Sequence, residues 1–514
     1  VDPVQAALSQ AAGLAESMGY FFEQARALYA SGVEYAEQSR YPEALEQFQL
    51  AVKAADSVGS AELATAIRES IVQIHTIQGD SPATSEVLQE IESQLVEDGD
   101  GDELALNLLA QARLLIGSYQ YGQAIEVLAG ALGYQNNSAI RRQINFELAK
   151  IFYETGRLDD VLEYLNVAGI NPASSQGRRV NPVVDVGEGL RILANTRRMR
   201  AEYAGMQEAR RAQGRYPVSA GQYLYDQALD TAAQPGKSVQ QAALLFKKSF
   251  EAATAAGHAD LADLARIQYC ARAETAGSIC SRVSLERSYD RLLKAGIPRF
   301  GAEAMFLRAQ VFDRNGQHRQ ALAVMEQLAD EVHLLRYSLA GVLGAWYWER
   351  REEVFGTWIR MLVADSKRRK SADASGSLLA LSKARHIERY TGLELTLSGS
   401  SGGNERLRTL LAQRAEFTGT GTALDLSYSI NSGLNGLRAD FRKRFEYLSA
   451  AGLSRYLRSL DNEESVLTYH LSPAFAQVWV AHKGRVVRRD IDKPFEIHEA
   501  LQTSRQGVES DGLA

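Results

Sequence analysis

The sequence of 514 residues is poor in proline, in cysteine, in long apolar runs and in excess positive charge. It has 10 prolines and 45% hydrophobic residues, which excludes a collagen-like or disordered chain and indicates a folded one. The longest candidate for a membrane span, residues 337–348, ends at the charged residues 349–351, so we expect no membrane-spanning helix. A formal net charge of −6 provides no general surplus of cations for a phosphate backbone, and a dedicated nucleic-acid binder is disfavoured.

The two cysteines, Cys270 and Cys280, are too few for a disulfide framework. They could form one bridge across a helical turn, which would indicate an exported protein, or remain two reduced, buried thiols in helices, which is the simpler interpretation. The sequence begins Val1-Asp2-Pro3, without an initiator methionine or a basic-then-apolar leader. We therefore expect that a leader has been removed or that the sequence starts inside a longer protein. Cytoplasmic and exported locations both stay open.

What the sequence does contain is internal repetition. Its length suggests about three domains, or one extended repeat array with something smaller. Residues 28–51 predict a helical hairpin with its turn at 39–42. Ala44, Phe48 and Ala51 are spaced by four and three, so they share one face of the second helix, where small residues allow two helices to touch.

The same offsets recur over residues 108–131, 149–168 and 309–328, and there is room for one degenerate hairpin between residues 61 and 95. The residues that carry the recurrence are Leu108, Ala112, Leu115, Tyr121, Ala124, Leu128, Ala131, Ala149, Phe152, Leu158, Val161, Leu165, Ala168, Ala309, Phe312, His318, Ala321, Met325 and Leu328. Segments 223–256 and 259–295 predict further hairpins, whereas 172–220 fits the pattern poorly. We expect about eight to ten hairpins, with the array occupying residues 1–395.

In these positions the chain resembles the tetratricopeptide-repeat family, whose unit of about 34 residues is a helix pair with small residues at the crossing points. It departs from the family in lacking the early tryptophan and in its longer spacings. The resemblance implies a mostly α-helical, curved solenoid whose inner surface, lined by the first helix of each hairpin, binds a peptide or helix of a protein partner. The groove-facing candidates that it implies are Arg26, Tyr29, Lys150, Tyr153, Gln310 and Arg314. The alternative for each is a solvated side chain on a helix surface.

Two arginine-rich stretches, residues 197–215 and 367–370, could form an anion-binding or nucleic-acid-binding patch. Glu202 and Glu208 interrupt the first stretch, and the second follows a predicted helix whose negative C-terminal end it would complement. We therefore interpret both as solvated helix faces.

The pattern changes after about residue 395. Residues 396–433 contain Gly- and Ser-rich interruptions and are interpreted as a linker. A helix over about 434–458 follows, and then three strands are predicted, at 465–471, 476–482 and 485–491. A tight turn at 483–484 would join the last two strands, and one more helix is expected at about 494–503.

The middle strand predicts how the sheet is buried. Val478 and Val480 alternate with Gln477, Trp479 and Ala481, so apolar residues lie on both faces, and both faces are expected to be covered. Three strands make a marginal unit alone, which predicts a larger sheet with further strands beyond residue 514.

This order of repeats, linker, helix and strands resembles the start of a CHAT domain, a caspase-like module that follows tetratricopeptide repeats in bacterial proteins. The resemblance implies that residues 434–514 are the first part of an α/β caspase-like domain. It also implies a cysteine peptidase that is held inactive until a partner engages the repeats. That chemistry needs a histidine followed by a cysteine thiolate, and no cysteine follows Cys280, so the catalytic residues would lie beyond this chain. His470, His482 and His498 are interpreted as surface residues.

The sequence therefore predicts a protein-binding, regulatory region of a repeat-plus-CHAT protein that binds a protein or peptide partner. The alternative is a non-enzymatic helical-repeat scaffold for complex assembly. No nucleotide-binding, hydrolase or metal-binding motif occurs, so we expect no cofactor, no metal and no catalytic residue within these 514 residues, and nucleic acid is an unlikely partner.

Overall fold

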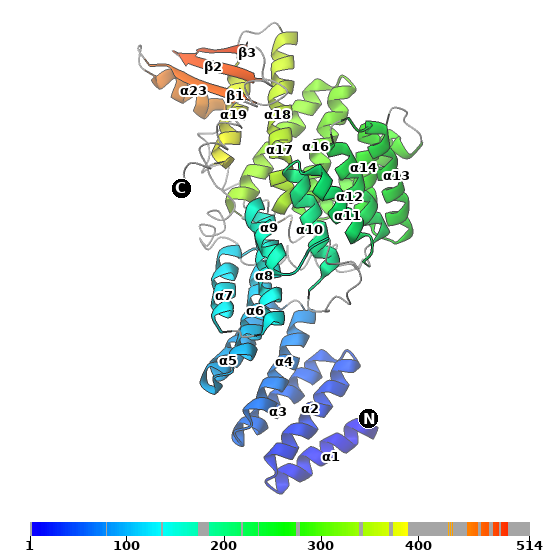
Figure 1. Ribbon diagram of the computed structural model, residues 1–514, viewed down its shortest axis with the longest axis vertical. Coiled ribbons are helices and arrows are strands. Elements are labelled where there is room, and N and C mark those ends of the chain that lie inside the picture. The colour runs from blue at the N-terminus through cyan, green and yellow to red at the C-terminus, as the bar shows by residue number, and fades with distance from the viewer. Residues whose placement is uncertain are drawn as a thin grey trace. The chain divides into compact units, whose positions relative to one another are not determined.

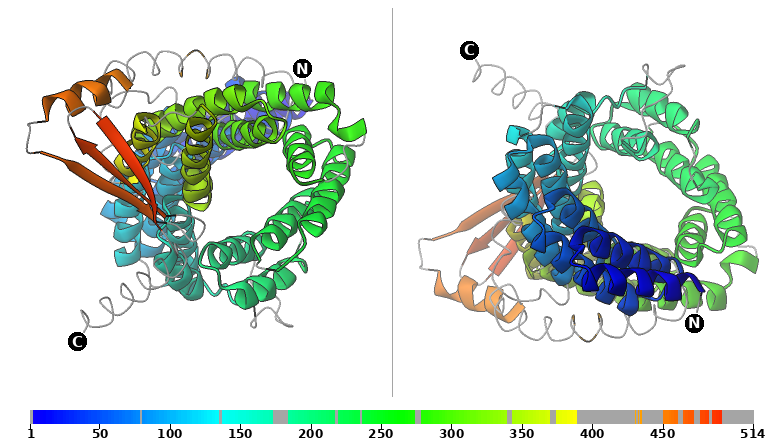
Figure 2. Two further views of the ribbon diagram at one scale, coloured as in Figure 1. Left: turned by 90° about the horizontal axis from the view of Figure 1, so that it is seen from above. Right: turned by 90° about the horizontal axis from the view of Figure 1, so that it is seen from below.

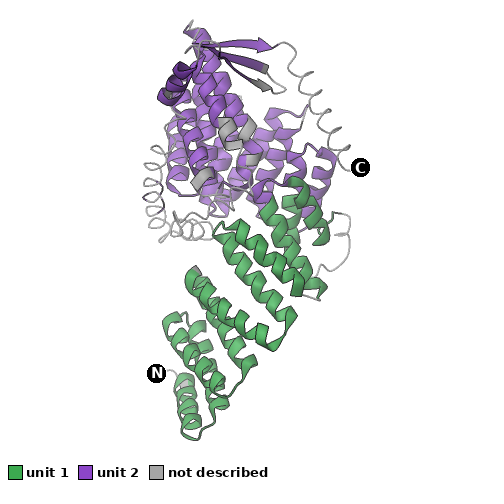
Figure 3. Cartoon of the chain, turned by 90° about the vertical axis from the view of Figure 1, so that its left-hand side faces the viewer, with its two compact units in different colours: residues 1–152, 158–193 green, residues 153–157, 194–514 purple. Residues whose placement is uncertain are grey.

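The computed structural model describes residues 3–78, 80–134, 137–172, 184–216, 219–234, 236–273, 278–338, 343–369, 374–388, 430, 432, 434, 450–460, 464–471, 476–482 and 485–491. The chain divides into two compact units (Figure 3). Unit 1 comprises Val1–Phe152 and Leu158–Leu193, and unit 2 comprises Tyr153–Arg157 and Ala194–Ala514. We describe each unit by itself.

Unit 1 is built from consecutive antiparallel helices, and from α1 to α7 each packs on the next (Figure 1). They are α1 (Pro3–Ser17), α2 (Phe21–Glu37), α3 (Tyr41–Ser57), α4 (Ala61–Gln78), α5 (Ser81–Asp98), α6 (Gly101–Gly117), α7 (Tyr121–Tyr134), α8 (Ser138–Thr155), α9 (Leu158–Val167) and the start of α10 (Val186–Met199). The predicted hairpins at 28–51, 61–95, 108–131 and 149–168 are confirmed as the pairs α2/α3, α4/α5, α6/α7 and α8/α9.

The crossing of α2 and α3 shows why small residues recur. Ala44 and Ala51 are fully buried and Phe48 is 1% exposed, as the spacing predicts. The ring of Phe48 lies directly over Gly32 of α2, where a β-carbon would collide with it. Tyr29 contacts the same ring, with the two centroids 5.6 Å apart. The close approach of the two backbones therefore depends on a residue without a side chain.

One turn geometry closes several of the hairpins. After α2, Ser39 adopts a positive φ of 58°, and the N–H of Arg40 donates to the carbonyl of Tyr35 over 2.9 Å, five residues back. This bond satisfies a carbonyl that the helix end would leave unpaired. The same five-residue bond closes the helices before Gln120, Ile170, His258 and Gln317. The same hydrogen bond therefore ends helices both within hairpins and between them.

Unit 2 continues with α11 (Tyr203–Gln213), α12 (Ala220–Ala233), α13 (Val239–Ala255), α14 (Ala259–Arg272), the 3-10 helix η1 (Ser278–Cys280), α15 (Arg282–Lys294), α16 (Pro298–Arg314), α17 (His318–Ser338), α18 (Gly344–Arg368), α19 (Ser375–Glu388) and α23 (Ala450–Ser459). The hairpins α12/α13, α14/α15 and α16/α17 follow one another along an arc (Figure 2), and the first helices of neighbouring hairpins contact each other. The segment 172–220, which fits the repeat pattern poorly, also contains helices, α10 and α11.

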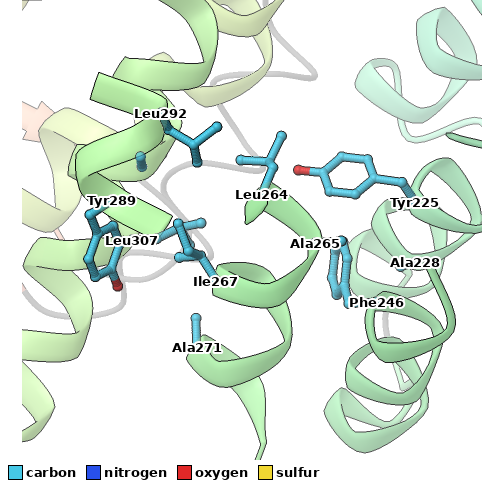
Figure 4. Packing of buried hydrophobic residues seen from close by; sticks show 11 residues of the cluster. Tyr225, Ala228, Phe246, Leu264, Ala265, Ile267, Ala271, Tyr289, Leu292 and Leu307 are labelled. Carbon is cyan, nitrogen blue, oxygen red and sulfur yellow. The ribbon is translucent and has the colours of Figure 1, made fainter. Parts of the chain in front are cut away.

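The core of these hairpins is continuous from α12 to α16 (Figure 4). Phe246 of α13 is fully buried and meets Tyr225 of α12 edge-on, with centroids 5.3 Å apart. Leu264 and Ile267 of α14 fill the space toward α15, where Tyr289 is buried. Each hairpin therefore covers the apolar face that its neighbour leaves bare.

The two cysteines form a disulfide that joins Cys270 in α14 to Cys280 in η1. Our simpler interpretation, two reduced thiols in helices, is therefore wrong. Cys280 lies outside the regular helices, in a short 3-10 turn that the spacing of the two cysteines did not reveal. The bond ties the end of α14 to the start of α15.

Removing this bond is expected to destabilise unit 2 by about 2–3 kcal/mol, because a loop closed by a disulfide has less entropy to lose on folding. Urea unfolding of the wild type with and without dithiothreitol measures the effect. The double variant C270S/C280S should match the reduced wild type and should not respond to reductant. Equal midpoints for oxidised and reduced wild type would show that the bond contributes nothing.

The C-terminal strands form one antiparallel meander in the order β1 (Val466–Leu471), β2 (Ala476–His482) and β3 (Arg485–Ile491), as predicted. Trp479 of β2 is fully buried, and its Nε1 donates to Ser377 Oγ of α19 over 2.9 Å. Val480, the next residue, is 37% exposed on the opposite face. Among the described residues the repeat array covers the face that carries Trp479, and the expectation that a larger sheet covers the other face stays a prediction.

Several sequence predictions fall outside the described residues. These are the boundary at 395, all of the linker 396–433 except Ile430 and Ser432, the turn at 483–484 and the helix at 494–503. The last part of the helix predicted over 434–458 is present as α23. The domain boundaries at 395 and 434 therefore stay predictions.

Candidate partner-binding surface

The arginine-rich stretch of unit 2 is a buried ion network, not a solvated face. Arg198 of α10 and Arg210 of α11 each have side chains that are 4% exposed. Asp230 of α12 accepts from Arg198 over 2.9 Å and from Arg210 over 2.7 Å, and Asp226 lies 3.2 Å from Arg210. The interpretation of Arg198 and Arg210 as part of a solvated helix face is therefore wrong. The neutralising carboxylates lie on another helix, α12, so the charges within residues 197–215 do not predict them.

Helix α18 joins this network from the far end of the array. Glu349 of α18 pairs with Arg198 over 2.9 Å, and the N–H of Ala345 donates to Glu154 over 3.0 Å. Burial alone would lower the pKa of Arg198, but the carboxylates of Glu349 and Asp230 outweigh it and raise that pKa. Both ends of the unit 2 array therefore meet at Arg198, and the curved row of hairpins is closed by α18 (Figure 2).

A second group of polar side chains runs across the first helices of three consecutive hairpins. We call it the polar belt, and its members are Gln268 and Arg272 of α14, Glu303 of α16, and Trp346 and Arg350 of α18. Glu303, which is 3% exposed, is the centre of the belt. It accepts from Trp346 Nε1 over 2.6 Å, from Arg350 over 3.1 Å and from Gln268.

Arg272 is the least compensated member of the belt. It is half-buried, and its guanidinium lies over the ring of Phe246, 5.1 Å from the centroid. It donates to the two oxygens of Gln268, and within the described part of the chain it has no carboxylate at ion-pair distance. Burial lowers the pKa of Arg272, and the neighbouring guanidinium of Arg350 lowers it further. A carboxylate brought to this position would stabilise a cation that the protein itself leaves in a poorly solvated place.

Three of the sequence-derived candidates lie in unit 1. Arg26 is exposed on α2, while Tyr29, on the same helix, is half-buried and its hydroxyl lies 3.2 Å from Ser70 Oγ of α4. Lys150 of α8 pairs with the buried Glu147 over 2.7 Å. Tyr29 therefore links α2 to α4, Lys150 pairs within its own helix, and Arg26 presents its side chain to solvent.

The other three candidates lie in unit 2. Tyr153 is 6% exposed, and its hydroxyl accepts from Asn195 over 3.1 Å, so it offers a partner little surface. Gln310 is half-buried and Arg314 is exposed, both near the end of α16. The six candidates belong to two units, and the structure does not assemble them into one site.

The sequence analysis did not identify the belt residues, although the sequence around two of them indicates a buried polar group. Glu303 stands in the run Ala302-Glu303-Ala304-Met305 and Gln268 follows Ile267, so both are polar residues on otherwise apolar helix faces. A buried carboxylate at such a place needs partners. The partners, Trp346 and Arg350, are some 43 to 47 residues further along the chain, which no local pattern predicts.

The histidines give no sign of a catalytic arrangement in the described residues. The Nδ1 atom of His482 lies 2.9 Å from the carbonyl of Glu464 and 3.1 Å from Ser465 Oγ, at the edge of the sheet. The side chain of His470, and all of His498, lie outside the described residues. No helix among the described residues has both the length and the apolar character that crossing a membrane requires.

Stacked helix pairs, small residues at their crossings and a recurrent turn define a helical-repeat protein that carries a small C-terminal sheet. No protein-family model matches the chain, and no curated protein matches it. Among solved structures it is similar to a chain titled "Crystal Structure of the Yeast Tom70", at 12% identity over 85% of this chain and 99% of that one. The TM-score is 0.19, so this likeness carries no argument about fold or function.

Proposed function

We propose that the chain is a protein-interaction region in which the polar belt of unit 2 binds an acidic segment of a protein partner. The observation that carries the proposal is the half-buried guanidinium of Arg272. Among the described residues it contacts only neutral groups and stands beside Arg350, while the carboxylates of Glu303 and Glu353 act on it only from beyond ion-pair distance. An acidic side chain would supply the missing charge, and Trp346, also half-buried, would supply apolar contact. The fold supports the same role, because stacked hairpins present extended surfaces for binding.

The proposal is tested with fluorescein-labelled glutamate-rich peptides and matching peptides in which glutamine replaces every glutamate. We expect the acidic peptides to bind more tightly, and Arg272→Gln to weaken them at least about tenfold, because a charge-assisted hydrogen bond is lost. Fluorescence anisotropy at two salt concentrations gives the dissociation constants. Equal binding of both peptide sets would contradict the proposal.

The sequence-derived surface makes a competing prediction that the same assay decides. If the partner binds at Arg26, Lys150 and Arg314, the triple charge reversal R26E/K150E/R314E weakens the acidic peptides and Arg272→Gln does not. If the belt is the site, the triple variant keeps nearly all of the affinity. Circular dichroism of both variants controls for folding.

A regulatory role for the binding is the finer part of the proposal. Helix α18 carries two belt residues, and at its other end Lys367 lies 3.4 Å from Asp490 of β3, while α19 holds Trp479 of the sheet. A partner at the belt could thus act on the C-terminal sheet, as control of a caspase-like peptidase encoded beyond this chain would require. The alternative is a non-enzymatic scaffold. A longer reading frame with further strands that end in a histidine and then a cysteine favours the peptidase, and a frame without them favours the scaffold.

A further inference from the structure

Arg272, on which the proposed function depends, is the last residue of α14. Its guanidinium donates to the backbone carbonyl and the side-chain oxygen of Gln268, one turn back in the same helix, and it lies over the ring of Phe246 of α13. The helix ends where the N–H of Ala273 donates to the carbonyl of Tyr269 over 2.8 Å. Because the last turn of a helix has fewer hydrogen bonds than its interior, it opens most easily. The position of Arg272 therefore depends on what holds this turn.

The disulfide holds the same turn from its other side. Cys270 stands between Gln268 and Arg272 in the sequence. Because a helix turns about 100° per residue, the side chain of Cys270 leaves α14 on the side opposite to both of them. Its partner, Cys280, is the last residue of η1, and the next residue, Ser281, is the N-cap of α15. The bridge therefore fixes the turn that carries Arg272 to the start of α15.

The packing of α14 on α15 does not depend on the bridge. Asp263 of α14 is buried and accepts from Ser288 Oγ over 2.8 Å and from Arg291 Nε over 2.6 Å, both on α15. Tyr289 and Leu292 of α15 are buried in the same apolar core as the middle of α14. Breaking the bridge should therefore leave the two helices packed and release only the last turn of α14.

The bridge is accessible to a reductant and can form again. Cys270 and Cys280 are only partly buried, and Ser278 and Ser281, close to Cys280, are exposed. A thiolate attacks a disulfide only where it can reach a sulfur, and this bond meets that condition. The cysteines are 10 residues apart and the chain has no third cysteine, so within one molecule the reduced pair can return only to the same bond.

We propose that reversible reduction of the Cys270–Cys280 bridge controls the affinity of the polar belt for its acidic partner, an inference that rests on the proposed function. A dithiol reductant supplies the two electrons. One of its thiolates attacks a sulfur of the bridge, the other protein sulfur leaves as a thiolate and takes up a proton, and the second thiol of the reductant then displaces the first protein sulfur. The products are two protein thiols and the reductant with an internal disulfide. In the reduced protein Arg272 has to be immobilised when the partner binds, which costs affinity.

Peptide binding to the full chain is the first test. Fluorescence anisotropy with the glutamate-rich peptides is measured for the oxidised chain and after reduction with dithiothreitol. We expect reduction to weaken binding about fivefold, the cost of immobilising one long side chain, and reoxidation to restore it. C270S/C280S should bind like the reduced wild type, with and without dithiothreitol. In the Arg272→Gln variant the oxidised and reduced chains should bind equally, because the bridge acts through that side chain.

Hydrogen exchange tests the local mechanism without any peptide. Reduction should speed exchange of the amides of residues 270–273 and leave residues 288–292 unchanged. Faster exchange throughout α14 and α15 would show that the bridge holds the whole hairpin, and would overturn the mechanism. Acidic peptides that bind the oxidised and reduced wild type equally overturn the inference and leave the proposed function intact. An oxidised chain that does not prefer acidic peptides to their glutamine counterparts contradicts the proposed function, and redox control of the belt is lost with it.

Discussion

Replacing Asp230 by alanine is expected to lower the free energy of unfolding of unit 2 by about 3–5 kcal/mol. Asp230 is the shared partner of Arg198 and Arg210, and all three side chains are nearly inaccessible to water. Without it, two guanidinium groups stay buried with only Glu349, Asp226 and neutral groups to compensate them. Urea unfolding monitored by circular dichroism gives the loss, and hydrogen exchange locates it in α10, α11 and α12.

The matched control is an exposed ion pair. Glu43 pairs with Arg40 over 2.7 Å on the surface of α3, where solvent screens the charges, so Glu43→Ala should leave the urea midpoint almost unchanged. An effect of Asp230→Ala as small as that of the control would mean that water reaches the network, and the buried-charge argument would be lost.

Trp479→Ala is expected to release the C-terminal sheet from the repeat array, with a local loss of about 3–5 kcal/mol. The indole is fully buried and donates to Ser377 Oγ, so truncation leaves a cavity and removes one hydrogen bond, while the Ser377 hydroxyl keeps its bond to the carbonyl of Ala374. Hydrogen exchange over residues 466–491 should rise by orders of magnitude, while exchange in α12 to α16 stays unchanged.

Val480→Ala is the control for this variant. It removes side-chain volume from the next position of the same strand, on the face that is exposed in the described structure, so protection of the sheet should hardly change. Equal loss of protection in both variants would show that the open face is covered in solution, contrary to our description of the sheet.

The parts of the fold that depend on neighbours in sequence were predictable. The spacing of Ala44, Phe48 and Ala51 identified a buried face because a helix repeats every 3.6 residues, and the apolar alternation of residues 476–482 identified β2. The same reasoning placed Trp479 and Val480 on opposite faces, which the structure confirms. It could not say that α19 would cover the face of Trp479.

The parts that depend on distant residues were not predictable. Arg198 and Arg210 look like ordinary surface cations until Asp230 and Glu349 are brought to them by the curvature of the array. The polar belt was not predictable for the same reason, because Glu303 meets Trp346 only through the stacking of α16 and α18. Periodicity gives the apolar faces of a helix, but it does not say which partner will cover each one.

The pairing of Glu349 with Arg198 has a consequence for how this protein can evolve. Repeat arrays commonly gain or lose whole hairpins, because each one contacts only its neighbours. Here the ion pair joins α10 to α18, so adding or deleting a hairpin between them would pull the two ends out of register. The number of hairpins in this segment is therefore held constant by a contact between its ends, and this stretch should vary by substitution while the more open row in unit 1 is free to vary in length.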